Sequence, residues 1–135
     1  MPTIYYADEA SQFGSKDPDC RRTFPWGKED KELQSFYQKA IAARNNNKNV
    51  FALGDLDTIL AQDNIYAYQR TAVDGSGKLG VVALNNGKAQ KVTLKVAGAA
   101  NKTFTDQLTG KKVTANNGEL TLTIGENQAM MLVSK

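Results

Sequence analysis

The pattern of hydrophobic and polar positions changes its period once along the chain, near Lys48. Between Lys28 and Asn45, apolar side chains recur at helical spacing, and beyond Lys48 apolar and polar residues alternate. An apolar stripe of period 3.6 is typical of a helix that packs on one side, whereas alternation is typical of half-buried strands. The pattern therefore predicts one helix, Lys28–Asn45, followed by a domain built from strands.

Short strands are predicted throughout this second part, separated by turns rich in asparagine and glycine, which tolerate positive φ. The predicted strands are Val50–Leu53, Ile65–Val73, Leu79–Asn85, Lys91–Ala97, Lys102–Asp106, Lys112–Val113, Leu120–Ile124 and Ala129–Val133. Strands of this length and spacing indicate an antiparallel β-sandwich. The residues predicted to form its core are Leu79, Val81, Leu94, Val96, Leu120, Leu122, Ile124 and Leu132.

The start of the chain has a different character. Pro2–Tyr6 is a continuous apolar run, as in strands buried on both faces of a parallel sheet, and a polar loop follows it as far as Gly27. A strand, a loop and a helix in this order make one unit of a (β/α)8 barrel, where ligand-binding groups lie on the loops after the strands. The chain is thus predicted to be mainly β, with residues 1–47 forming this unit and residues 48–135 the sandwich.

Composition excludes several kinds of chemistry. The 135 residues contain no histidine and one cysteine, Cys20, which excludes Ser-His-Asp and Cys-His catalysis, zinc sites built on these residues, and an internal disulfide. The net charge is +3 and the lysines are scattered, so nucleic acid is not an expected partner. No apolar stretch approaches the roughly 20 residues of a membrane span, so no membrane partner is expected, and the compartment stays open.

Asp17 and Arg21, four residues apart in the loop, are the foremost candidates for a binding site. A carboxylate accepts hydrogen bonds and a guanidinium donates several in fixed directions, which matches the vicinal hydroxyls of a sugar. The alternative is a structural ion pair, with Asp17 capping a turn before Pro18. Phe13 and Trp26 are the aromatic candidates for stacking on a sugar ring, with core packing as the alternative.

Other groups are weaker candidates. Asp8 and Glu9 are adjacent acids, but neighbours on a strand point to opposite faces, so no catalytic residue is expected among them. Tyr66 and Tyr68 share one face of a predicted strand, either as a carbohydrate patch or as a packed face. Three acids in a predicted turn region could offer carboxylate oxygens to calcium; they are Asp55, Asp57 and Asp63. They lack the spacing and the glycine of a calcium-binding loop, so no cofactor is expected.

The opening motifs resemble those of a known family. The matching residues are Pro2, Ile4, Tyr5, Tyr6, Asp8, Glu9, Gly14, Asp17, Pro18, Asp19, Arg21, Arg22, Pro25 and Trp26. They are similar to the eighth barrel strand and the following loop of glycoside hydrolase family 13, the α-amylase family, and especially of its neopullulanase, cyclomaltodextrinase and maltogenic amylase branch. The rest, including the turn Asp106-x-Leu108-x-Gly110, looks like the sandwich called domain C.

The resemblance implies a parent enzyme that hydrolyses α-1,4 and perhaps α-1,6 glucosidic bonds of maltodextrins with retention, in which Asp17 and Arg21 hold glucose units on the non-reducing side of the cleaved bond. The catalytic carboxylates of the family lie on earlier barrel strands, upstream of Met1. We therefore expect an inactive C-terminal fragment, whose partners would be α-glucan and the missing barrel; calcium in the parent finds no support in this segment. The alternative function is a carbohydrate-binding or interface module.

Two consequences follow from the resemblance. Without neighbouring strands, Pro2–Tyr6 would be disordered or paired with another copy of the chain. Ala7, Ser11 and Ser15 also stand where the family commonly has glycine. Any of these three positions that requires positive φ would be strained by its side chain.

Overall fold

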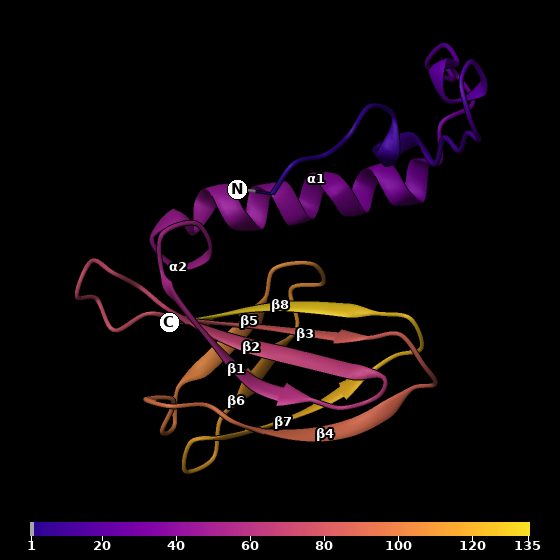
Figure 1. The fold of residues 1–135 in the computed structure, drawn as a ribbon. Helices are drawn as coiled ribbons and strands as arrows, with labels where there is room; N and C mark the ends of the chain where they lie inside the picture. The colour runs from indigo at the N-terminus through magenta and orange to yellow at the C-terminus, as the bar shows by residue number, and fades with distance from the viewer. Residues whose placement is uncertain (1) are drawn as a thin grey trace. The chain divides into compact units, whose positions relative to one another are not determined.

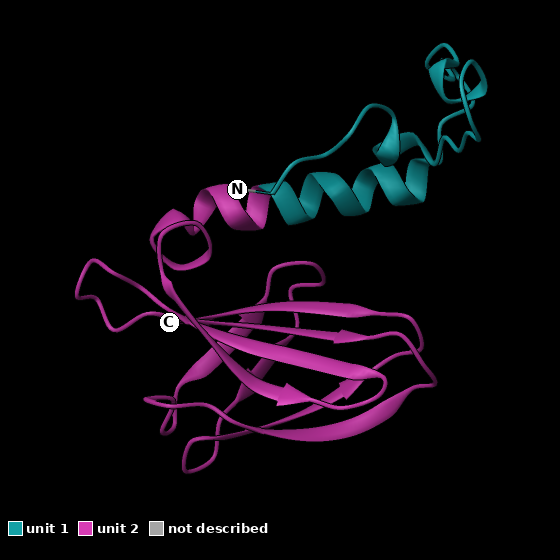
Figure 2. Ribbon diagram, viewed as in Figure 1, with its two compact units in different colours: residues 1–41 teal, residues 42–135 magenta. Residues whose placement is uncertain are grey.

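The computed structural model describes residues 2–135 and divides into two compact units, residues 1–41 and residues 42–135 (Figure 2). The boundary between these units lies within the longest helix, α1, Lys31–Asn46. The domain limits expected from the sequence, 1–47 and 48–135, stay a prediction. Within residues 2–135, no helix combines the length and the hydropathy required to cross a membrane.

The second unit is the predicted antiparallel β-sandwich (Figure 1). Its larger sheet has six strands in the order β1-β2-β3-β8-β5-β6, and the smaller sheet pairs β4 with β7. The strands are β1 Asp55–Ala61, β2 Ile65–Thr71, β3 Leu79–Asn85, β4 Gln90–Lys95, β5 Thr103–Asp106, β6 Lys112–Thr114, β7 Glu119–Ile124 and β8 Ala129–Ser134. Every pairing is antiparallel, and the strands predicted beyond Asn64 agree with the observed ones to within a few residues.

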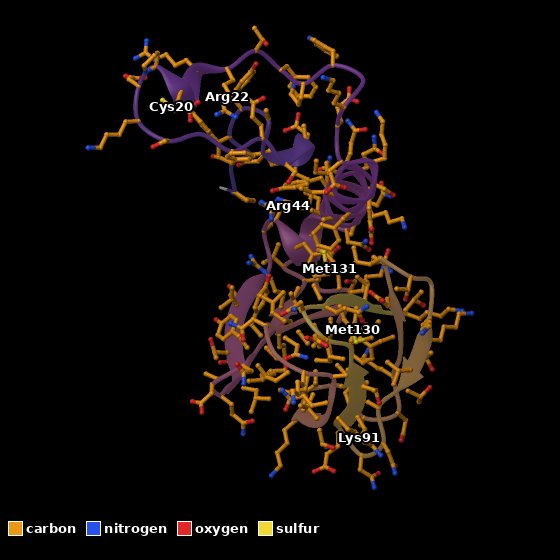
Figure 3. The ribbon with its side chains drawn as sticks, turned by 90° about the vertical axis from the view of Figure 1, so that its right-hand side faces the viewer. Cys20, Arg22, Arg44, Lys91, Met130 and Met131 are labelled. Atoms are coloured by element: carbon orange, nitrogen blue, oxygen red, sulfur yellow. The ribbon has the colours of Figure 1, made fainter. Side chains whose placement is uncertain are left out.

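The core lies between the two sheets, and all eight residues predicted for it are buried. Because successive strand residues point to opposite faces, β8 contributes to both sides of the larger sheet. Met130 packs on the core between the sheets, whereas Met131 packs on a second cluster on the outer face (Figure 3). The alternation in the sequence therefore identified the inward positions correctly.

The turn that follows β5 is built around a buried acid, Asp106. Its Oδ1 accepts N–H bonds from Leu108 at 3.2 Å and from Met131 at 3.1 Å, and its Oδ2 accepts the hydroxyl of Thr109 at 2.5 Å. Gly110 ends the turn with φ of 77°. A buried carboxylate is tolerated here because hydrogen bonds replace its contacts with water.

Two sequence predictions at the start of the sandwich are wrong. Val50–Leu53 was predicted as a strand, but Lys48–Phe51 forms a short helix, α2, whose Val50 and Phe51 pack on the outer face of the larger sheet. A short apolar run has no period that distinguishes a strand from a buried helical turn. The strand β1 was not predicted, because an exposed edge strand that carries Asp55 and Asp57 resembles a polar turn.

The first unit contains two 3-10 turns, η1 Asp8–Ala10 and η2 Asp19–Arg21, and the first part of α1. The helix begins at Lys31 rather than at Lys28, because the carboxylate of Asp30 accepts the N–H of Leu33 at 2.9 Å and so caps the helix. The strand predicted at Pro2–Tyr6 does not form, and residues 2–41 contain no strand. A strand of the parallel type needs neighbours to receive its hydrogen bonds, and these residues supply none.

Candidate functional site

Asp17 and Arg21 form a two-pronged ion pair. The guanidinium Nε donates to Asp17 Oδ1 at 2.8 Å, and Nη2 donates to Oδ2 at 3.0 Å. The pair faces solvent, since the side chain of Arg21 is 76% exposed and that of Asp17 is 61% exposed. The spacing of four residues suggested this pairing, and η2 supplies the local turn that brings the two groups together.

Cys20 adds a third group to this pair. Its Sγ donates to Asp17 Oδ1 at 3.0 Å. The hydrogen bond from Cys20 and those from Arg21 lower the pKa of Asp17, so this carboxyl is ionised at neutral pH. In return, the bond to Asp17 raises the pKa of the Cys20 thiol, which keeps the thiol protonated and makes it a poor nucleophile.

A second ion pair, between Asp19 and Arg22, lies in the same loop. Arg22 donates to Asp19 Oδ1 from Nε at 2.7 Å and from Nη2 at 2.5 Å, and the N–H of Ser15 donates to Asp19 Oδ2 at 2.8 Å. The N–H of Ser15 and the guanidinium of Arg22 lower the pKa of Asp19. This pair was not predicted from the sequence, although the spacing of three residues between Asp19 and Arg22 was an available signal.

The aromatic candidates Phe13 and Trp26 are both exposed, at 78% and 79%. The Phe13 ring lies beneath the guanidinium carbon of Arg22, 5.1 Å from the ring centroid, as in a cation–π contact. Trp26 lies beside Phe24 with 4.6 Å between ring centroids, and Phe24 also contacts Tyr6 edge-on at 6.3 Å. Trp26 therefore belongs to an aromatic row and Phe13 to the ion-pair loop, and neither is a core residue.

The sequence predicted Asp8 and Glu9 on a strand, with their side chains on opposite faces. They lie on the turn η1 rather than on a strand, and the carboxylate of Asp8 accepts the N–H of Tyr5 at 3.0 Å. Glu9 instead borders an open hollow of about 370 Å³ within the first unit. The hollow is lined by Ile4, Tyr5, Tyr6, Ala7, Glu9, Phe24, Gln34, Tyr37, Gln38 and Ile41.

Tyr66 and Tyr68 lie on the outer face of the larger sheet, with 5.9 Å between their ring centroids. Tyr66 is exposed and its hydroxyl is 3.0 Å from the hydroxyl of Thr58, which fixes the ring. Tyr68 packs on the outer cluster formed by Val82 and its neighbours. The face is therefore partly packed and partly exposed.

The acids considered for calcium are not gathered. Asp55 and Asp57 lie on β1, and Asp63 lies in the turn after it. Within residues 2–135, no three acidic or cysteine side chains come together in an arrangement that could hold a metal ion.

Several known proteins are similar to this chain in sequence and in fold. No protein-family model matches the chain. It is 40% identical to an amylopullulanase of Thermoanaerobacter thermohydrosulfuricus over 99% of this chain and 10% of that protein. It is 38% identical to neopullulanase 2 of Thermoactinomyces vulgaris over 97% of this chain and 23% of that protein. A crystal structure of an Anoxybacillus α-amylase matches with a TM-score of 0.84 at 28% identity, over 96% of this chain and 28% of that one.

These likenesses define a class first: the chain is a β-sandwich of the kind found in α-amylases, together with the loop and helix that precede it. Over nearly its whole length the chain is similar to enzymes of the α-amylase family, glycoside hydrolase family 13, so the predicted family resemblance is confirmed. It spans a small part of its relatives, between 10% and 23% of the two enzymes named above.

Proposed function

We propose that this chain is a segment of an α-glucan-hydrolysing enzyme, in which the loop with Asp17 and Arg21 holds a glucosyl unit at the rim of the active site. The observation that carries the proposal is the exposed two-pronged pair between these side chains. The similarity to relatives that include an amylopullulanase and a neopullulanase supports α-glucan as the ligand.

The pair has hydrogen-bonding capacity left for a sugar. Arg21 uses Nε and Nη2 for Asp17, and its Nη1 donates to no group within residues 2–135. A guanidinium carries five N–H groups and a carboxylate about four acceptor positions, so each group can also reach a hydroxyl. Because each member orients the other, little side-chain freedom would be lost when a sugar binds.

The proposal assigns no catalytic residue to this chain. Retaining hydrolysis requires two carboxyl groups about 5–5.5 Å apart on either side of the scissile bond. Asp8 and Glu9 are assigned no part in such a pair, and Asp8 accepts the backbone N–H of Tyr5. The role proposed for the loop with Asp17 and Arg21 is to form part of the substrate rim. The second unit forms the accompanying sandwich.

The test is a titration of the full 135-residue chain with maltotriose, in which binding is detected from the shifts of backbone amide signals in NMR spectra. We expect shifts in loop 13–22 that disappear in Asp17→Ala and in Arg21→Ala. Arg21→Lys keeps the charge but cannot donate two parallel hydrogen bonds to Asp17, so it should bind maltotriose more weakly than the unaltered chain. Lys16→Ala, in the same loop, is the control and should bind as tightly as the unaltered chain. Shifts that persist unchanged in both alanine variants would show that the pair does not hold the sugar.

A second candidate function is carbohydrate binding by the sandwich. The specific observation is Tyr66, whose ring is exposed and is held by Thr58 next to Leu84 on the neighbouring strand. Affinity electrophoresis in soluble starch distinguishes the two candidates. Retardation that is lost in Tyr66→Ala but not in Arg21→Ala would favour the sandwich.

A further inference from the structure

The second ion pair of the loop has a different environment from the proposed sugar-binding pair. The side chains of Asp19 and Arg22 are 38% and 46% exposed, well below the values for Asp17 and Arg21. One oxygen of Asp19 receives two bonds from Arg22, and the other receives the N–H of Ser15. Most of the accepting capacity of this carboxylate is therefore used inside the loop.

The contacts of Asp19 and Arg22 join the two ends of the loop. Ser15 and Phe13 lie at its start, Arg22 lies at its end, and the Arg22 guanidinium contacts both Asp19 and the Phe13 ring. The chain also passes very close to η2 at Gly14, where an added Cβ would lie 2.7 Å from the Cα of Cys20. The start of the loop is thus held directly against the turn that carries Cys20 and Arg21.

The orientation of Arg21 depends on this arrangement. Asp19 is the first residue of η2 and Arg21 is the last, so fixing Asp19 to Ser15 and Arg22 also fixes the turn that directs Arg21 toward Asp17. A two-pronged ion pair requires two N–H groups of the guanidinium to align with the two oxygens of the carboxylate. A small rotation of the turn would break it.

We propose that Asp19 and Arg22 are positioning residues: they form a clasp that closes the loop and holds Asp17 and Arg21 in the geometry that binds the glucosyl unit. The sugar-binding part of this inference rests on the function proposed above. The clasp itself does not, because it can be measured without a ligand.

Cys20 provides that measurement, since it is the one cysteine of the chain and its Sγ donates to Asp17. A thiol reacts as its thiolate, so a shift of Asp17 away from Cys20 should increase the rate of alkylation by iodoacetamide at neutral pH. Asp17→Ala sets the rate without the hydrogen bond. Asp8→Ala is the matched control, because its carboxylate also accepts a backbone N–H within the first unit but lies outside the clasp.

In addition to the hydrogen bond to Asp17, the charge of Asp19 itself raises the pKa of the Cys20 thiol, so removing that charge would speed alkylation even in an unchanged loop. The deciding variant is therefore Arg22→Lys, which keeps the positive charge but cannot donate two N–H groups to Asp19 from one planar group. We expect Arg22→Lys to react several-fold faster than the unaltered chain and to approach the Asp17→Ala rate, and Asp8→Ala to react at the original rate. If Arg22→Lys is unfolded by circular dichroism, Arg22→Gln is the second test, because the loss of a nearby positive charge would by itself slow the reaction. A rate that does not rise in a folded Arg22 variant overturns the clasp.

Maltotriose titrations of Asp19→Ala and Asp8→Ala test the link to function. We expect Asp19→Ala to weaken binding several-fold and Asp8→Ala to leave it unchanged. If Asp19→Ala binds as tightly as the unaltered chain, the positioning role is overturned. If the unaltered chain does not bind maltotriose while the alkylation rates respond as expected, the clasp is supported and the function proposed for Asp17 and Arg21 is overturned.

Discussion

The side chain of Gln69 and the backbone of Ala97 exchange two hydrogen bonds. Gln69 Nε2 donates to the carbonyl oxygen of Ala97 at 3.1 Å, and the N–H of Ala97 donates to Gln69 Oε1 at 2.8 Å. Gln69 lies on β2 of the larger sheet, whereas Ala97 follows β4 of the smaller one. The amide of a buried glutamine therefore joins the two layers of the sandwich as a neighbouring strand would.

Replacing Gln69 with methionine should destabilise the sandwich. The side chain has a similar volume, but both bonds to Ala97 are lost, at a cost of about 1–3 kcal/mol in the free energy of unfolding. Urea unfolding followed by circular dichroism measures this change, and the exposed Gln62→Met is the matched control. A loss no larger than that of the control would mean that water replaces these bonds without cost.

Leu122→Ala should destabilise the same unit through its core. Leu122 on β7 is 2% exposed, and truncating a buried leucine costs about 2–5 kcal/mol through lost contacts and the cavity left behind. The adjacent Thr123 is exposed, so Thr123→Val should change the unfolding free energy by about 0.5 kcal/mol or less. Equal effects of the two substitutions in chemical denaturation would contradict the observed faces of β7.

Ser11→Gly should stabilise the first unit. Ser11 has φ of 59°, in the left-handed region, where a side chain is unfavourable and glycine is not. Ser15 is the control within the same loop, because its φ is not positive and glycine there only adds freedom to the unfolded chain. The expected result is slower amide exchange of Gln12, which donates to Ala7, in Ser11→Gly but not in Ser15→Gly. Faster exchange in Ser11→Gly would show that the serine is not strained.

Asp74 should make the second unit sensitive to acid. Hydrogen bonds from the side chain and N–H of Ser76, and from the amide of Asn49, lower the pKa of Asp74 to about 2. An unfolded aspartate has a pKa of about 3.9, so the ionised form favours the folded state above that pH. This contribution is lost as the pH falls from about 4 to about 2.

The carboxyl titration of Asp74 by NMR checks this expectation. Its midpoint should lie near pH 2 in the unaltered chain. It should move upward, toward the usual aspartate value, in Asn49→Ala, which removes the donor at 2.6 Å. An unchanged midpoint in that variant would assign no part of the shift to Asn49.

The N-terminal segment should promote self-association. Ile4, Tyr5 and Tyr6 are exposed at 43%, 74% and 53%, although their side chains are largely apolar. Exposed apolar segments of this kind pair or aggregate more readily than charged ones. Light scattering should show an average mass that rises with concentration for the unaltered chain and stays monomeric for the double variant Ile4→Ser with Tyr5→Ser. A monomer at every concentration in both would remove this expectation.

The loop shows how far spacing alone can predict a site. Four residues between Asp17 and Arg21 indicated a pair, and the structure contains it. The spacing could not reveal that Asp19 receives the N–H of Ser15, or that Arg22 lies over Phe13, because these contacts depend on how the backbone turns between them.

The sandwich could be predicted from the sequence because several of its strands, such as β2 and β7, have one buried and one more exposed face. The alternation along Glu119–Ile124 is therefore visible in the sequence itself, with Leu120, Leu122 and Ile124 inward. Where a run of residues lacks this alternation, its secondary structure depends on the segments that lie next to it in space. Val50 and Phe51 became helical because a turn of helix packs them on the outer sheet face. Pro2–Tyr6 formed no strand, because an extended chain becomes one only when another strand receives its hydrogen bonds.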